Sequence, residues 1–535
     1  MKNSCMMFAL TCIVLLVTAC SLPDYGIAPS GVQQVVVQQS TEDYDYYHEY
    51  DDATPTAVNA PAAKLENSDI LRLSMRHPLT LNPLTNEDET VARILRLIFE
   101  PLIVLDSNLR PTSHLADIEF ASDFSSVSLT IRSDAFWSDG MPVTSDDIIF
   151  SIQTLRNASS HAIYRQNVQN IANVTRQSTR VVHVYFHNST VCAAMSLGFP
   201  IIPQHHYRTQ ATRLTNMNPI GNGPFMLQNL SHMRGMRLEQ NPYSFRTPPH
   251  ASYIDVIFLS DQQTDMYAFD QGLIDAINLP LTEWARHHSV RHIRHEIVPA
   301  MFFEFIGFNF ENEIFTSEYT RQGIAHAFNI DAAIDAVYLT HAVRTTSPIH
   351  PYFWAASNVQ GLPYNPQRAR VLLNTAFANY PLVIIANNDN FQRVSIANRL
   401  AASLIAVGVP AVVEAVPYEE YFTRLQDGDF DLFIGGVNLS FAPDIEFLFN
   451  GSGIFMYDPQ LISNFAATGL AVTEAMYIQA IAAFQQNFAE RVPVISLGFR
   501  HSGMLTNMRV IQPGTPAPDN VFGDVNQWLV GTISP

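Results

Sequence analysis

Strand-like and helix-like segments alternate in the second half of this chain, and their order constrains the fold more than any other feature of the sequence. Short apolar runs at 382–386, 411–415 and 430–434 are typical of buried strands. The segments 368–377 and 394–407 carry apolar residues at helical spacing and alternate with these runs. Because a strand–helix–strand order packs helices against a sheet, the sequence predicts mixed α/β lobes.

The first half of the chain carries comparable signals. Residues 70–75 and 127–131 alternate apolar and polar side chains, as half-buried strands do, and 89–97 has the apolar spacing of a helix. Thr144 is expected to begin another helix, because its hydroxyl suits the N-cap and Asp147 three residues later suits the positive helix terminus.

Length and charge narrow the function. A chain of 535 residues exceeds one ordinary core, so we expect two or more lobes. The formal net charge of -19 argues against nucleic acid as a partner. Lys2 and Lys64, the two lysines of the sequence, both precede the segments that look folded. Lysine-dependent catalysis and a phosphate-binding lysine are therefore excluded from the folded body, and any ATP hydrolysis must occur on another protein.

The first twenty residues look like a secretory signal. A basic Lys2 is followed by an apolar run over residues 6–17 and by small residues leading into Cys20. The apolar run is short for a membrane-spanning helix, so a retained anchor helix is the weaker interpretation. The pattern resembles a bacterial lipobox, in which Cys20 is lipidated and becomes the mature N-terminus. Such an anchor would hold the protein on the extracytoplasmic face of the cell membrane, or its periplasmic side in a host with an outer membrane.

Cysteine use follows from this processing. Cys5 and Cys12 would leave with the signal and Cys20 would carry lipid, so Cys192 would be the last free thiol and no internal disulfide could form. No reactive motif surrounds Cys192, and we expect a buried, small, apolar side chain.

Residues 21–67 are expected to form a disordered acidic tether. The segment is rich in Gln, Ser, Pro, Ala and Asp, and it includes an acidic, tyrosine-rich run at 41–52. Low hydrophobicity and net negative charge favour a solvated linker over a packed element.

Motifs of the common enzyme classes are absent from the sequence. It contains no H-E-x-x-H, C-x-x-C, G-x-S-x-G or G-x-G-x-x-G motif and no phosphate loop, so we expect neither an enzyme nor a cofactor. The glycines of 221–224 have the wrong spacing for a phosphate cradle and favour a turn. The histidine-rich run from His287 to His295 could bind a transition metal, but its interspersed arginines favour a solvated face.

From about residue 68 onward, a series of short motifs occurs in a recognisable order. The strongest is Trp137–Asp147, which reads WSDGMPVTSDD. The others are Leu81–Pro83 (LNP), Ile98–Leu102 (IFEPL), Pro219–Phe225 (PIGNGPF), Ala325–Asp331 (AHAFNID) and Tyr364–Leu373 (YNPQRARVLL). In this order the chain resembles the bacterial extracellular solute-binding proteins of family 5, the oligopeptide, dipeptide and nickel receptors of ABC importers.

The resemblance implies a two-lobed, periplasmic-binding-protein-like fold of type II, a clamshell with an extra N-terminal subdomain. Lobe one would combine 68–303 with 493–535, and lobe two would span 304–492. Crossover strands would lie near 302–308 and 492–498. A ligand enclosed between closing lobes couples occupancy to shape, which a membrane permease and its ATPase can sense.

The resemblance also points to ligand contacts. In the family, an aspartate in a motif like G-W-x-x-D-Y-x-D-P pairs with the ammonium of a peptide, and here Ser440 occupies that position. A neutral hydroxyl cannot replace an ion pair in a dry cleft, so the free-N-terminus clamp is in doubt. Asp444 or Glu89 could supply the charge instead, although Asp444 also suits a helix N-cap after Pro443.

Other candidate contacts follow from the same resemblance. Tyr164, Tyr418 and Gln392 match positions of cleft aromatic and polar residues, and Arg393 could receive a ligand carboxylate. Gly436 and Asn438 belong to the segment that carries Ser440 and complete the predicted ligand site.

The function expected from the sequence is capture of peptides by the substrate-binding lipoprotein of an ABC importer. A receptor for a non-peptide solute, such as a nickel chelate or a glycan, is the alternative that Ser440 makes more plausible. A secreted hydrolase would need a nucleophile and a base converging in the cleft, and no motif supports one. A surface adhesin is the remaining alternative.

Overall fold

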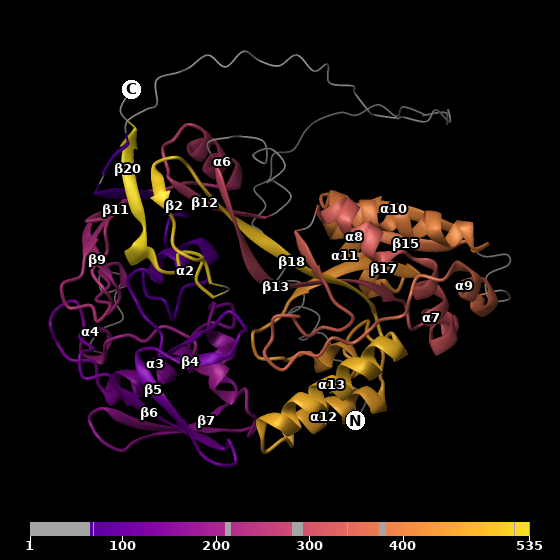
Figure 1. Ribbon diagram of the computed structural model, residues 1–535, viewed down its shortest axis with the longest axis horizontal. Coiled ribbons are helices and arrows are strands. Elements are labelled where there is room, and N and C mark those ends of the chain that lie inside the picture. Colours follow the sequence, from indigo (N-terminus) through magenta and orange to yellow (C-terminus); the bar gives the residue numbers. More distant parts are fainter. Residues whose placement is uncertain are drawn as a thin grey trace.

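The computed structural model consists of two bodies of mixed α/β structure that lie side by side (Figure 1). It describes residues 65–67, 69–208, 216–280, 293–339, 341–373, 381–517 and 519–533. The expected signal segment with Cys20 and most of the expected tether lie outside these residues. Within the described ranges, no helix has the length and apolar character needed to cross a membrane.

The first body contains two four-stranded sheets and two smaller ones. One has the order β2 (Ile70–Met75), β11 (Tyr253–Phe258), β10 (Gly235–Gln240), β9 (Phe225–Ser231). The other has the order β5 (Ala116–Phe120), β6 (Ser126–Ile131), β8 (Val181–Phe186), β7 (Ile171–Arg176). The smaller sheets are β3 (Ile103–Leu105) with β4 (Pro111–Ser113), and β1 (Leu65–Asn67), β20 (Leu529–Ile533) and β19 (Val510–Gln512).

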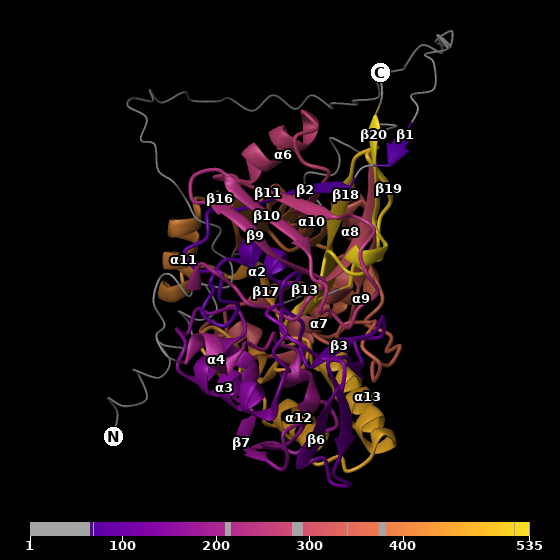
Figure 2. The same ribbon diagram turned by 90° about the vertical axis from the view of Figure 1, so that its left-hand side faces the viewer.

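The last of these sheets joins the two ends of the described chain. Strand β1 pairs antiparallel with β20 near the C-terminus, and Figure 2 shows β1, β19 and β20 together at one edge of the first body. The tether was expected to extend through residue 67, whereas β1 begins at Leu65. Pairing with β20 gives these backbone groups the hydrogen-bond partners that a solvated linker would take from water.

Helices and short 3₁₀ turns cover the first body. They are α2 (Glu89–Leu95), α3 (Ser145–Arg156), η1 (Arg165–Val168), η2 (Ala193–Leu197), α4 (Gln204–Tyr207), α6 (Gln262–Asp270) and η6 (Val525–Gln527). The prediction that Thr144 caps a helix is confirmed, because the carboxylate of Asp147 accepts the backbone N–H of Thr144 at 2.8 Å. The same carboxylate accepts Nε1–H of buried Trp137 at 3.3 Å, so this motif stabilises the first body.

One large sheet connects the bodies. Its order is β12 (Ala276–Pro280), β18 (Ile495–Thr506), β13 (Arg294–Phe308), β17 (Leu432–Asn438), β15 (Leu382–Asn387), β16 (Ala411–Val416), and β14 (Ala342–Arg344) also pairs with β18. Strands β13 and β18, of 15 and 12 residues, run from one body into the other (Figure 1). The predicted crossovers at 302–308 and 492–498 fall in β13 and around the start of β18. The exact lobe boundaries stay a prediction.

The second body has helices on this sheet. They are η4 (Glu313–Phe315), α7 (Glu318–Ala327), α8 (Ile330–Tyr338), α9 (Pro366–Leu373), α10 (Phe391–Ala406), α11 (Tyr418–Asp427), η5 (Glu446–Leu448), α12 (Pro459–Gly469) and α13 (Glu474–Arg491). Strand β15 pairs in parallel with β16 and β17, so the strand–helix–strand prediction is confirmed. Helix α10 begins three residues earlier than predicted, because the side chain of Asn390 caps it by accepting the backbone N–H of Arg393 at 3.1 Å.

Each body has its own apolar core, and a third apolar cluster spans both. The first core draws on strands β2, β6, β8 and β10, and the second on β15, α8 and α10. The third cluster combines buried residues of the first body with aromatic residues of the second. Its members from the first body are Leu109, Val191, Cys192 and Met195. The two bodies are therefore in apolar contact as well as covalently joined.

Candidate functional site

A buried ion-pair cluster lies where β13 crosses between the bodies. Glu304 on β13 is 2% exposed, and its carboxylate meets two arginines. Its Oε2 lies 3.3 Å from Nε of Arg393 in the first turn of α10, and its Oε1 lies 3.3 Å from Nε of Arg500 on β18. Two arginines thus share one carboxylate, and the cluster brings together β13, α10 and β18.

The backbone opposite leaves room for this cluster. Gly436 on β17 pairs with Glu304, and a Cβ at Gly436 would lie 2.6 Å from the Glu304 carboxylate and 2.8 Å from Nη2 of Arg393. Arg500 also stacks on Phe302, with its guanidinium carbon 3.8 Å from the ring centroid, a favourable cation–π geometry. The Arg500 side chain is 26% exposed and that of Arg393 is 7% exposed, so Arg500 is the more accessible cation at the crossover.

An apolar pocket opens beside Ser440. Its empty volume, with the open side included, is about 230 Å³. The residues that line it come from β13, from the loop after β14 and from the segment after β17: Met301, Pro348, Ile349, His350, Phe353, Leu439, Ser440, Phe441, Pro443 and Ile445. Among these described lining residues there is no Lys, Arg, Asp or Glu, so the pocket offers no fixed charge to a ligand.

His350 is the polar group buried in this pocket wall. The side chain lies against Phe499, with 4.6 Å between ring centroids, and the residue is 2% exposed. Its Nδ1 accepts the backbone N–H of Tyr352 at 3.1 Å. Burial and then the neighbouring His501 lower the pKa of His350 to about 3. The imidazole is therefore neutral at physiological pH, and its Nε2 has no hydrogen-bond partner among the described residues.

A polar and aromatic contact ties the two bodies together. Arg110 of the first body pairs with Glu474 at the start of α13, with Nη1 2.7 Å from Oε1. The Arg110 guanidinium carbon lies 4.4 Å from the ring centroid of Trp354, which stacks on Tyr477. Figure 1 shows α12 and α13 beside the part of the first body that holds β4 and β7. The two bodies are thus in contact at a distance from the strands that join them.

The residues predicted around Ser440 occupy the end of β17 and the following segment. The Ser440 hydroxyl donates to the carbonyl of Ala442 and the residue is exposed. Asn438 is the last residue of β17 and exposed, and Asp444 is also exposed. The alternative that Asp444 caps a helix is wrong, because the N-cap position of η5 is Ile445. Gly436 lies two residues before Asn438, against the Glu304 cluster.

The other predicted contacts are dispersed. Glu89 is exposed at the start of α2 and pairs with Arg93. Tyr164 packs against the core of the first body. Gln392 is buried in α10 next to Arg393, and Tyr418 is half-buried at the start of α11. None of these residues lines the pocket beside Ser440, and their roles toward a ligand stay predictions.

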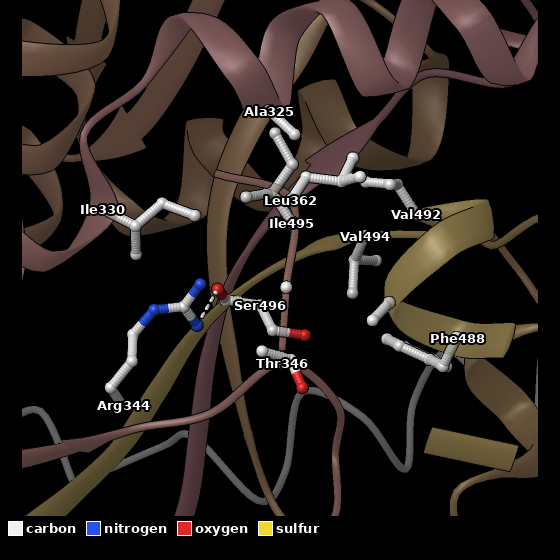
Figure 3. A pocket seen from close by; sticks show the side chains of 12 residues that line it. Ala325, Ile330, Arg344, Thr346, Leu362, Phe488, Val492, Val494, Ile495 and Ser496 are labelled. Atoms are coloured by element: carbon white, nitrogen blue, oxygen red, sulfur yellow. Dashed lines mark hydrogen bonds between the residues drawn. The ribbon is translucent and has the colours of Figure 1, made fainter. Parts of the chain in front are cut away.

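A second pocket, with an empty volume of about 320 Å³, lies within the second body (Figure 3). Apolar side chains such as Ile330 and Val494 line it, and Arg344 at its side donates to the carbonyl of Ser496 at 2.9 Å. Arg344 also pairs with Asp331 at 3.2 Å. The pocket contains no predicted ligand contact, so the pocket beside Ser440 is the better candidate.

Two further expectations concern metals and thiols. Most of the histidine run, residues 287–292, lies outside the described residues, so its metal binding stays a prediction. In the part of the chain that the structure describes, no group of three or more His, Cys, Asp or Glu side chains is placed to hold a metal ion.

The prediction for Cys192 is confirmed: it is a buried free thiol, and burial raises its pKa to about 12.

Sequence reasoning missed Glu304, Arg500 and His350. Glu304 interrupts the apolar run Met301–Phe308, and a single carboxylate in such a run signals a buried charge that needs a partner. The partner could not be inferred, because Arg393 is 89 positions away in the sequence. His350 carries no local motif that would separate it from other histidines of the chain.

Two lobes joined by long crossover strands and closing over a cleft define a clamshell solute-binding protein. The family model for bacterial extracellular solute-binding proteins, family 5, matches residues 110–453. The chain therefore belongs to this family, which confirms the resemblance and the fold. Its members bind solutes rather than transform them, so the protein is a binding protein and not an enzyme.

Named relatives agree with this assignment. The chain is 20% identical over 422 residues to the oligopeptide-binding protein AppA of Bacillus subtilis, a match that covers 73% of this chain and 77% of the relative. It spans 64% of the length of similar peptide-binding relatives from Pseudomonas aeruginosa and Brucella ovis.

Solved structures share the fold. The ABC transporter substrate-binding protein CtaP of Listeria monocytogenes superposes with a TM-score of 0.76 at 16% identity, covering 87% of this chain and 100% of that one. NikZ of Campylobacter jejuni, solved with Ni(L-His), gives a TM-score of 0.68 at 19% identity, covering 87% and 99%.

Proposed function

We propose that the protein is the substrate-binding component of an ABC importer, and that it captures peptides between its lobes and delivers them to a membrane permease. The observation that carries this proposal is the pair of crossover strands β13 and β18, beside which the Glu304 cluster and the pocket at Ser440 lie. The name of the Bacillus subtilis relative, an oligopeptide-binding protein, supports peptides as the solute. A hinge of this kind couples ligand occupancy to lobe closure, which a permease can sense.

The pocket chemistry also supports an uncharged contact with the ligand. The free-N-terminus clamp of the family would need a carboxylate at position 440, and Ser440 is neutral. Peptide groups, which are uncharged and carry both a donor and an acceptor, suit a pocket without fixed charge. The candidate contacts Glu89, Tyr164, Gln392, Arg393, Tyr418, Gly436, Asn438, Ser440 and Asp444 remain part of this proposal.

A non-peptide solute is the second candidate. Position 440 carries a serine and not a carboxylate, which removes the group expected to recognise a peptide N-terminus. NikZ, which has a similar fold, was solved with the metal chelate Ni(L-His). A nickel chelate or a glycan is therefore carried as the alternative ligand class.

Thermal stability in the presence of ligands tests the proposal. We would express residues 69–535 without lipid, strip bound solutes by denaturation and refolding, and compare random tri- to nonapeptide pools with Ni–histidine and a sugar panel. A ligand at about 100 times its dissociation constant stabilises the native state by about 2.7 kcal/mol, a readable shift of the melting temperature. We expect peptides alone to raise it. A shift with Ni–histidine or a sugar and none with peptides would replace the peptide assignment by the second candidate.

Lipid attachment at Cys20 is the second part of the proposal. It places the body on the extracytoplasmic side of the cell membrane, next to the permease and ATPase subunits that would be its partners. Growth with labelled palmitate should label the full-length chain and leave Cys20→Ala unlabelled. Equal labelling of both chains would refute Cys20 as the attachment site.

A further inference from the structure

The tautomer of His350 is determined by its surroundings. Nδ1 accepts the backbone N–H of Tyr352 at 3.1 Å, so this nitrogen carries no proton. In a neutral imidazole the proton then belongs to Nε2, which becomes a hydrogen-bond donor. The ring is neutral because burial and His501 lower its pKa to about 3.

This donor has no partner in the part of the chain that the structure describes. His350 is 2% exposed, and its Nε2 has no hydrogen-bond partner among the described residues. A buried donor without an acceptor is costly, and such groups are rare unless a ligand or water completes them. His350 is among the residues that line the pocket beside Ser440, and we place the missing acceptor for Nε2 in this pocket.

The remaining pocket chemistry restricts what can bind. With no Lys, Arg, Asp or Glu among the described lining residues, neither a carboxylate nor an ammonium group finds a counter-charge there. The Ser440 hydroxyl donates its hydrogen to the carbonyl of Ala442, and its oxygen can still accept a hydrogen bond. One donor and one acceptor among apolar walls complement a single uncharged peptide group.

We propose that Nε2–H of His350 donates to the carbonyl oxygen of an internal or acylated peptide group in this pocket, and that this contact makes a free N-terminus unnecessary for binding. The inference rests on the proposed function and names its substrate class more closely.

Two substitutions of His350 test the donor Nε2–H separately from the acceptor Nδ1, which holds the backbone N–H of Tyr352. In His350→Asn the side-chain oxygen can still accept the N–H of Tyr352 in the manner of an Asx turn, but no donor reaches the position of Nε2. In His350→Gln the amide N–H₂ reaches that position, but the acceptor for Tyr352 is lost. The melting temperature of the ligand-free protein should fall in both variants, because each loses the ring that packs on Phe499, and it should fall further in His350→Gln, which also loses the acceptor for Tyr352.

Binding is measured with two pentapeptide pools of equal composition, one with free and one with acetylated N-termini. Peptides retained by each variant are identified by mass spectrometry, and the dissociation constant of the most enriched acetylated peptide is measured by calorimetry. We expect wild type to bind acetylated and free forms within about threefold, His350→Asn to bind about tenfold more weakly, and His350→Gln to stay within about threefold of wild type.

Two results would overturn the inference while leaving the peptide-receptor assignment intact. One is wild-type affinity in His350→Asn, and the other is a preference of tenfold or more for free N-termini in wild type. The second comparison needs no variant and decides the matter even if His350→Asn does not fold. If wild type retains peptides from neither pool, the proposed function itself fails and this inference with it.

Discussion

Replacing Glu304 by glutamine is expected to lower the free energy of unfolding by about 3–5 kcal/mol, because removing one member of a buried ion pair leaves an uncompensated charge. Arg393, with 7% of its side chain exposed, would lose its carboxylate partner in a site that water cannot readily fill. Arg500 would suffer less, since 26% of its side chain is exposed. Equilibrium unfolding in urea, followed by tryptophan fluorescence, measures the change.

The exposed pair of Arg132 and Asp134 provides the matched control. Both side chains are substantially exposed and 2.9 Å apart, so Asp134→Asn should change stability by less than about 1 kcal/mol. Combining Glu304→Gln with Arg393→Met should recover part of the loss, because the stranded cation is removed with its partner. A change below about 1 kcal/mol in Glu304→Gln would contradict the assigned role.

Gly221→Ala should destabilise the first body by about 4 kcal/mol, from overpacking and from hydrogen bonds broken as the backbones separate. A Cβ at Gly221 would lie 2.0 Å from the carbonyl oxygen and 2.8 Å from the carbonyl carbon of Ile98. The backbone of Ile98 cannot rotate away from this Cβ as a flexible side chain would. The bonds at risk are those from Gly223 N–H to Ile98 O, at 2.8 Å, and from Ser138 N–H to Gly221 O, at 2.7 Å.

Gly469→Ala is the control for this variant. Gly469 ends helix α12, and a Cβ there meets no atom within 4 Å. Alanine has the higher helix propensity, so stability should stay constant or rise by up to about 1 kcal/mol. Thermal and urea unfolding of both variants give the comparison. Equal unfolding midpoints for Gly221→Ala and wild type would show that the two backbones can part without cost.

Local patterns in the sequence were sufficient to predict strands and a helix of the second lobe. The apolar strands at β15 and β16 and the helix α10 between them were predicted within a few residues of their observed bounds, because period and propensity act over a few neighbours. The capping box at Thr144 and Asp147 depends on three consecutive peptide units and was predicted for the same reason.

The candidate site was much less predictable. The resemblance named Ser440, Gly436 and Arg393 as ligand contacts. The structure adds that Ser440 lines a pocket, that Gly436 lies against Glu304, and that Arg393 pairs with Glu304. His350 lies 90 positions before Ser440 and yet lines the same pocket. Contacts of this kind arise from lobe packing, which leaves no periodic trace in the sequence.

The sequence by itself determined the α/β class, the family and the neutral residue at position 440, because these depend on residue identity and on patterns over short distances. Only the tertiary structure decided that Glu304 holds two arginines from other elements, and that Arg110 joins the lobes through Glu474. It also decided that His350 has a buried donor with no acceptor among the described residues. The physical reason is that burial and pairing are properties of groups brought together from distant segments. The cost of an unpaired buried group therefore cannot be assessed until the chain has folded around it.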